Sequence, residues 1–218
     1  HNVSSAASDV YKRQSLNNTN NFEIIDCETN EASTFTSTYL IGSDGADSFI
    51  RKSLNVNLYD YKCDQDWIVV DYLVDKKYKI LDKSRYQICD YKRPTTLLPI
   101  TDNHVRWEFK INPEDDVDKL ETEESIRSFM SPHMWRLNPD IDINSGELIR
   151  SSKYTFHGLL ADNFKVNNCF LIGDAAHQTP PFLGQGLCQG IKDAYNVSWK
   201  LAGVKEGIYS KQILDSFD

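Results

Sequence analysis

In the last quarter of this chain, apolar positions first form a continuous run and then recur at helical spacing. Residues 169–172 form a short apolar run whose length suits a buried strand, and the run stops at Gly173. A loop rich in glycine and proline follows. Beyond it, apolar or small side chains recur at helical spacing, at Leu187, Ile191, Ala194 or Tyr195, Ser198 and Leu201. The pattern predicts a buried strand, a loop and a helix in that order.

A second short strand runs into an acidic turn earlier in the chain. Residues 39–42 are mostly apolar and lead into Ser43-Asp44-Gly45. A brief helix is predicted over 48–54, carrying Arg51 and Lys52. Taken alone, either strand with its acid is compatible with an ordinary turn, because Asp-Gly is a common turn dipeptide. Two such units in one chain are more informative than one.

The N-terminal part of the chain has little periodicity. Residues 1–21 are rich in Ser, Asn and Ala and lack the apolar core of a signal peptide, so we predict no regular structure there. Residues 22–25 are followed by a polar stretch and then by a run of Thr and Ser that extends to Thr38. This second part predicts a hairpin.

The middle of the chain is rich in β-branched and aromatic residues. Several of these runs alternate between apolar and polar positions, which predicts an antiparallel sheet built from residues 67–73, 86–89, 95–99 and 105–109, with a further strand over 149–160. A surface helix is predicted to begin near Glu114 within 112–130 and to end at Ser131-Pro132, its acidic run 114–124 facing solvent. The fold class we expect is α/β with a mixed α+β character.

Composition and charge restrict the kind of partner. The chain has 218 residues, 40% of them apolar, which is enough for a core. A formal net charge of −8 argues against a nucleic-acid partner, and no segment resembles a membrane span. The cysteines are odd in number and scattered, and the histidines are dispersed, so we expect reduced thiols in a cytoplasmic protein and no metal site.

The segment from Gly173 to Gly186 carries the candidate chemistry. Asp174, at the end of a strand, can accept hydrogen bonds from a ligand hydroxyl, and the small residues around it let a ligand lie against the backbone. Gly184 and Gly186 permit positive φ angles and close approach. The helix that follows directs its free N–H groups and positive dipole end at the same place, so an electron-rich or anionic guest is expected. The alternative is a tight crossover that needs these residues only for its geometry.

Three motifs together resemble a known family. They are YLIGSDGADSFIRKSL, then RYQICDYKRPTTLLP with VRWEF, then CFLIGDAAHQTPPFLGQGLCQGIKDAYNVSWKLA. The combination resembles the FAD-dependent aromatic hydroxylases, or class A flavoprotein monooxygenases, and within them the 3-(3-hydroxyphenyl)propionate hydroxylase type. The resemblance covers residues 22 to 218, whereas residues 1–14 do not resemble the family.

The resemblance implies a reaction and its cofactors. FAD is expected to be reduced by NADH or NADPH and, through a flavin hydroperoxide, to hydroxylate a phenolic substrate with molecular oxygen. Two other readings remain open: a flavin-dependent epoxidase or reductase, and a non-catalytic small-molecule binding module. No general base is assigned. His177, Arg93, Arg106 and Glu108 are interpreted as structural residues, and the oligomeric state stays open, with a homo-oligomer as one option.

The resemblance also implies site residues. The Asp44-Gly45 motif, with Arg51 as its basic residue, is expected near the route of the flavin and nicotinamide pyrophosphates. Gly173 and Asp174 are expected to hold the ribityl and ribose side of FAD. The flavin ring is expected to be lined by a segment comprising Pro181, Gly184, Gln185, Gly186 and Leu187.

Domain limits follow from the same comparison of motifs. Residues 22–60 and 161–218 are expected to be parts of an FAD-binding, Rossmann-like domain, interrupted by an antiparallel-sheet substrate domain over 61–160. The strand, G-x-G-x-x-G turn and helix with which the family begins are missing from the sequence. We therefore expect an internal fragment that binds FAD weakly or not at all by itself.

Overall fold

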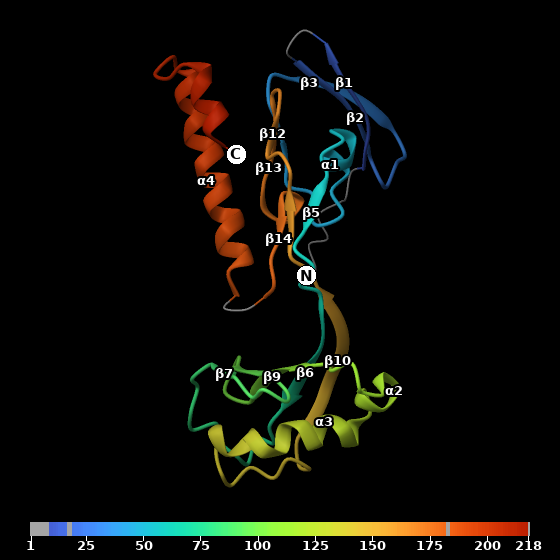
Figure 1. Ribbon diagram of the computed structural model, residues 1–218, viewed down its shortest axis with the longest axis vertical. Helices are drawn as coiled ribbons and strands as arrows, with labels where there is room; N and C mark the ends of the chain where they lie inside the picture. Colours follow the sequence, from blue (N-terminus) through green and yellow to red (C-terminus); the bar gives the residue numbers. More distant parts are fainter. Residues whose placement is uncertain (1–8, 17–18, 182–183, 218) are drawn as a thin grey trace. The chain divides into compact units, whose positions relative to one another are not determined.

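The computed structural model describes residues 9–16, 19–181 and 184–217. The described residues form two compact units: one made of the chain up to Cys63 together with the chain from His157 onward, and one made of Asp64–Phe156. We call them the first unit and the inserted unit. Each is described separately below, and Figure 1 labels their elements.

The first unit opens with an antiparallel sheet. Its strand order is β1 (Asp9–Leu16), β2 (Thr19–Ile25), β3 (Ala32–Ser37). The predicted hairpin is confirmed, since β2 and β3 pair antiparallel from Asn20 opposite Ser37 onward. The structure also has a strand where none was predicted: β1 lies within residues 1–21 and pairs with β2.

A parallel pair of strands lies at the centre of the first unit. Strand β13 (Cys169–Leu171) pairs parallel with β4 (Leu40–Gly42) and antiparallel with β12 (Lys165–Val166). All of β13 is buried, which confirms the predicted buried strand. A second small sheet has the order β14 (His177–Gln178), β11 (Leu159–Ala161), β5 (Leu58–Asp60). The parallel pairing brings the ends of two strands, each followed by an acidic turn, to the same edge.

Helices flank these strands. The predicted short helix is present as α1 (Phe49–Ser53), and the predicted long helix as α4 (Gly186–Lys205), which is followed by a 3-10 segment, η4 (Lys211–Phe217). In Figure 1, α4 runs beside β12 and β13. The contact is apolar: Phe170 of β13 packs in one cluster with Val197 of α4 and with Leu214 and Phe217 of η4.

The inserted unit is an antiparallel sheet covered on one face by helices. The strand order is β10 (Glu147–Phe156), β6 (Gln65–Leu73), β9 (His104–Lys110), β8 (Thr95–Pro99), β7 (Tyr86–Ile88), and every pairing is antiparallel as predicted. Strand β9 buries Val105, Trp107 and Phe109 on one face. These side chains share a core with Ile126 and Met130.

The helical region of the inserted unit differs from its prediction. The structure has two helices, α2 (Val117–Leu120) and α3 (Glu123–Met130), where a single helix from near Glu114 was expected. The interruption comes from Thr122, whose hydroxyl accepts a hydrogen bond from the Ser125 backbone and caps α3. The end of the α-helix at Met130 agrees with the prediction, and the chain continues as a 3-10 segment, η1 (Ser131–Arg136). The expected strand over 149–160 is divided between β10 and β11.

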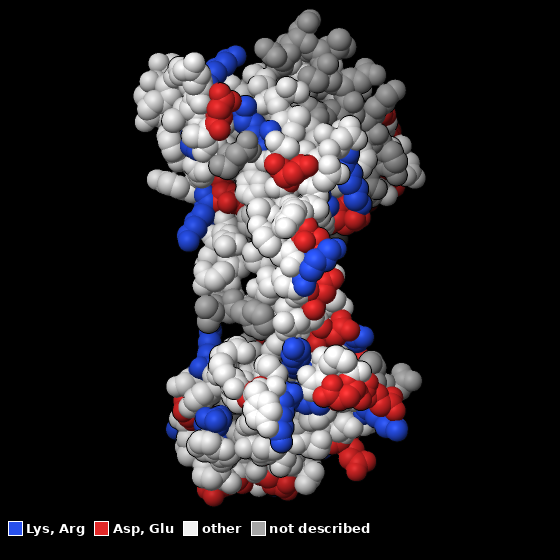
Figure 2. Space-filling model, in the orientation of Figure 1, with Lys and Arg blue, Asp and Glu red and all other residues white. Residues whose placement is uncertain are grey.

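Charge is distributed over the surface. Figure 2 shows Lys and Arg interspersed with Asp and Glu in each unit, without a continuous basic area on the face that it presents. No helix among the described residues is long and apolar enough to cross a membrane.

Candidate functional site

The first acidic turn is held by its own side chains. After β4 the chain turns at Gly45, which has a φ of +82° that favours glycine. The carboxylate of Asp44 accepts hydrogen bonds from the Ser48 hydroxyl at 2.5 Å and from the Ile50 backbone at 3.0 Å. The Ser48 hydroxyl in turn caps α1 by accepting from the Arg51 backbone at 2.9 Å. The Asp44 carboxylate therefore fixes the start of α1, and Asp44 itself is exposed.

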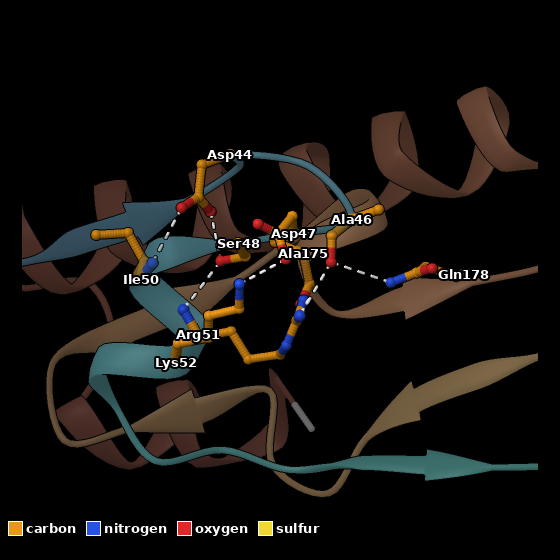
Figure 3. A network of polar contacts seen from close by, with 9 residues as sticks. All are labelled: Asp44, Ala46, Asp47, Ser48, Ile50, Arg51, Lys52, Ala175 and Gln178. Atoms are coloured by element: carbon orange, nitrogen blue, oxygen red, sulfur yellow. Dashed lines mark hydrogen bonds and ion pairs between the residues drawn. The ribbon is translucent and has the colours of Figure 1, made fainter. Parts of the chain in front are cut away.

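Arg51 joins the two acidic turns. Its side chain is buried, and its guanidinium donates to the Ala175 carbonyl at 2.9 Å and to the Ala46 carbonyl at 2.9 Å. Figure 3 shows these bonds, with Gln178 donating to the same Ala46 carbonyl. Ala46 follows the Asp44-Gly45 turn, and Ala175 follows Asp174. The arginine predicted near the cofactor thus connects the first acidic turn with a carbonyl that is 124 residues away from it in the sequence.

The second acidic turn presents its acid to solvent. Gly173–Ala175 form a single 3-10 turn, η2, that begins with a left-handed Gly173 at φ +59°. Ala175 and Ala176 are buried, whereas Asp174 is exposed. Within the described residues the Asp174 carboxylate accepts no hydrogen bond. It is therefore available to a ligand hydroxyl.

Helix α4 holds this second acidic turn through the side chain of Asp193. The Asp193 carboxylate accepts a hydrogen bond from the Gly173 backbone at 2.9 Å and lies 2.6 Å from Nε2 of His177. His177 is buried, which agrees with its interpretation as a structural hydrogen-bonding residue. The sequence reasoning missed Asp193. The available signal was an acid at helical spacing from Gly190, on a helix expected to pack against the turn.

The start of α4 is open. Gly184 has a φ of +62°, and a Cβ placed on Gly184 or on Gly186 meets no atom of the described residues within 4 Å. The N-cap residue Gln185 forms no side-chain cap, and the first turn of α4 contains no acid. Leu187 is 77% exposed and Pro181 is exposed. The helix therefore directs backbone N–H groups and its positive dipole end to open space, as an electron-rich ligand requires.

The polar residues of the inserted unit form framework pairs. Arg106 donates to both carboxylate oxygens of Asp71, at 2.9 and 3.0 Å, and these bonds lower the pKa of Asp71. Arg93 forms a similar pair with Asp115 at 2.8 Å. Burial raises the pKa of Glu108. The interpretation of Arg93 and Arg106 as framework residues therefore agrees with the structure.

Metal binding finds no support in the described part of the chain, where no group of three or more His, Cys, Asp or Glu side chains is arranged to hold an ion. The site that remains consists of the two acidic turns, joined through Arg51, and the start of α4. All of it lies in the first unit.

Solved structures with the same fold are flavoproteins. The chain superposes on aklavinone-11 hydroxylase, solved with FAD and aklavinone, with a TM-score of 0.76 and 19% identity, over 96% of this chain and 39% of that one. It superposes on the flavin-dependent monooxygenase PieE, solved with FAD and substrate, with a TM-score of 0.73 and 22% identity, over 96% and 36%. The fold is therefore that of FAD-binding proteins, and the predicted mixed α/β class is confirmed.

Membership follows from the sequence matches. The FAD binding domain family matches residues 11–218, so the chain belongs to that family. The expected cofactor, FAD, is confirmed at the level of the family. The match begins before residue 22, so the expectation that residues 1–14 are unlike the family is wrong from residue 11 onward.

Relatives in the family carry one recurring name. A 3-(3-hydroxy-phenyl)propionate/3-hydroxycinnamic acid hydroxylase of Burkholderia cenocepacia (strain HI2424) is 33% identical over 180 residues, which cover 83% of this chain. A protein of the same name from Klebsiella pneumoniae subsp. pneumoniae is 34% identical over 187 residues, which cover 86%. The resemblance stated from the motifs is therefore confirmed. The chain spans 32% of the length of each of these relatives.

Proposed function

We propose that the protein to which this chain belongs is an FAD- and NAD(P)H-dependent monooxygenase that hydroxylates a phenolic aromatic compound. The observation that carries the proposal is the joining of the two acidic turns by Arg51 beside the open start of α4. The names of the hydroxylase relatives support the choice of reaction.

The donor set of the first unit fits FAD. A dinucleotide brings hydroxyl groups, which need acceptors, and an electron-rich ring, which needs N–H donors. Asp174 is an exposed acceptor, and the side chain of the N-cap residue leaves the first N–H groups of α4 to other acceptors. A Cβ on Gly45, Gly184 or Gly186 would meet no atom of the described residues within 4 Å, which leaves room for a ligand to lie against the backbone.

Each part of the site receives a role in this proposal. Asp174 would accept hydrogen bonds from the ribityl and ribose hydroxyls. The turn from Gly184 to Gly186, with Pro181, Gln185 and Leu187 around it, would lie against the flavin ring and stabilise negative charge there. The Asp44-Gly45 turn would border the pyrophosphates. FAD, when bound, supplies the redox chemistry and activates oxygen.

The inserted unit is proposed to cover the substrate. Its sheet has one face packed on the helices of its core, while the other carries Asp71, Arg106 and Glu108 at alternating positions. A cover over the aromatic ring would exclude water from the reaction. The proposed domain limits stay 22–60 and 161–218 for the FAD-binding part and 61–160 for the substrate part.

The proposed compartment is the cytoplasm. All five cysteines lie in the described part of the chain and none of them forms a disulfide. Free thiols are typical of reducing compartments, which supports this proposal.

The test uses the whole protein that contains the chain. Purified protein should carry a flavin absorption spectrum and should oxidise NADH or NADPH with oxygen uptake when a phenol is added, giving a hydroxylated product. An epoxide product, or reduction without oxygen uptake, would contradict the proposed reaction. Asp174→Ala should raise the Kd for FAD about 10-fold or more, because a hydrogen bond to a charged group contributes about 1.5–3 kcal/mol. Asp140→Ala, at an exposed acid of the inserted unit, is the matched control and should leave the Kd unchanged.

A further inference from the structure

One oxygen of Asp193 holds two points of the second acidic turn. Its Oδ2 accepts from the backbone N–H of Gly173 at 2.9 Å and lies 2.6 Å from Nε2 of His177. Because a carboxylate only accepts hydrogen bonds, Nε2 is the ring nitrogen that carries the proton. The side chains of His177 and Asp193 are 9% and 20% exposed. Both bonds are therefore largely shielded from water.

The backbone of α4 lies close to the turn at the same place. A Cβ placed on Gly190 would lie 3.5 Å from Cα of Gly173, an ordinary van der Waals contact, so helix and turn are separated by the width of one methyl group. Gly190 and Asp193 are three residues apart and thus lie on one face of α4. This approach, together with the Asp193 bonds, holds the turn against the helix.

Gly173 and His177, the two partners of Asp193, flank the exposed Asp174 in the sequence. Gly173 precedes Asp174 directly and takes the left-handed φ of +59°, and His177 follows three residues later. The acid between them is exposed and forms no hydrogen bond within the described residues. The direction of the Asp174 side chain is therefore set by Gly173 and His177, which Asp193 holds.

We propose that Asp193 is a positioning residue for FAD binding: from α4 it holds Gly173 and His177 so that the Asp174 carboxylate stands ready for the hydroxyls of the cofactor. Asp193 itself does not contact the ligand. This inference rests on the proposed function, in which Asp174 binds FAD. Preorganising an acceptor in this way improves affinity because less order has to be imposed when the ligand binds.

The test compares three variants in the whole protein. Asp193→Ala removes both bonds and should raise the Kd for FAD about 10-fold. Asp193→Asn keeps an oxygen that can accept from Gly173 and should recover part of this loss. Glu206→Gln, an exposed acid-to-amide change at the other end of α4, should bind FAD as the wild type does. Circular dichroism at the assay temperature ensures that all variants are folded, so that the Kd reports positioning.

Three further measurements separate positioning from general weakening of the fold. Hydrogen exchange of the FAD-free protein should speed up in the peptide that contains 170–178 in Asp193→Ala and should stay unchanged in peptides of the inserted unit. In nitrogen NMR spectra, the proton on Nε2 of His177 should lose its preference over Nδ1. At saturating FAD, kcat should stay within about twofold of the wild type, because the reacting atoms do not touch Asp193.

The outcomes distinguish the two proposals. If the wild type binds FAD and Asp193→Ala binds it equally well, the positioning role is refuted and the proposed function stands. If exchange changes equally throughout the chain, Asp193 is a general stability residue and the positioning role is again refuted. If the wild type binds no FAD, the proposed function fails and this inference fails with it.

Discussion

Replacing Arg51 by methionine should loosen both acidic turns at once. Methionine has a similar length but donates no hydrogen bond, so the carbonyls of Ala46 and Ala175 each lose a bond of 2.9 Å to a buried guanidinium. A hydrogen bond from a charged donor contributes about 1.5–3 kcal/mol, so the two together should contribute about 3 kcal/mol or more to the local stability.

The loss of local stability is distributed over the two acidic turns. Hydrogen exchange measured by mass spectrometry reports each segment separately, and about 3 kcal/mol corresponds to exchange that is about 100-fold faster. We expect this acceleration in the peptides that cover 40–54 and 170–178. Arg51→Lys keeps the charge but lacks the planar guanidinium that reaches both carbonyls. It should therefore destabilise the two turns about half as much as Arg51→Met does, by about 1.5 kcal/mol.

Lys52 provides the matched control. It is adjacent in α1, and its side chain is 56% exposed and, within the described ranges, pairs only with the exposed Asp47. Exposed ion pairs contribute little, so Lys52→Met should leave exchange in both peptides unchanged. If Arg51→Met accelerates exchange only in 40–54, or no more than Lys52→Met does, then Arg51 does not join the two turns and the reasoning is refuted.

Three further predictions concern the stability of each unit. The pKa of Asp71 is lowered by its bonds from Arg106, so this pair stabilises the fold above the unfolded pKa of about 3.9 and the contribution is lost as the pH falls through the lower folded pKa. Wild-type unfolding free energy, measured with denaturant, should fall more between about pH 6 and about pH 3 than that of Asp71→Asn. In Gly146→Ala the new methyl group would overlap the Tyr72 hydroxyl, which should cost about 1–3 kcal/mol in the same assay, and an unchanged midpoint would contradict this. Ser48→Ala removes the buried cap of α1 and should cost about 1 kcal/mol, visible as faster exchange in 40–54.

Local patterns were sufficient to predict most elements of this fold. Alternation in residues 105–109 predicted a strand with one buried face, and β9 buries Val105, Trp107 and Phe109 in that way. The same reasoning gave one helix where α2 and α3 are separate, because an acidic, helix-favouring composition does not reveal that Thr122 caps a new helix. Strand pairing lay beyond local patterns, since β4 and β13 are about 130 residues apart and their parallel contact depends on the whole unit.

The site residues named from the sequence stay a prediction, and the structure shows how each of their side chains is held. Asp174 is exposed and available, as expected from its place after a strand. Asp44 and Arg51 were assigned to the cofactor, yet their side chains bond to the fold: Asp44 to Ser48 and Ile50, and Arg51 to the carbonyls of two loops. A motif identifies which residues recur around a ligand. It does not separate those that touch the ligand from those that hold the loops, because both are needed for the same geometry.

Helix α4 shows why hydropathy alone does not reveal which side of a helix is buried. The apolar positions that predicted the helix are largely exposed, with Leu187 at 77%, Ile191 at 59% and Tyr195 at 73%. The inner face combines the apolar side chains of Val197 and Leu201 with glycines and paired polar groups. Gly203 lies where a Cβ would overlap the ring of Tyr209, and the buried Lys200 donates to the Ser216 carbonyl at 2.7 Å. A helix that packs against a backbone turn as well as a strand needs small residues and satisfied polar groups beside its apolar contacts, so apolar periodicity alone does not determine which side of α4 is buried.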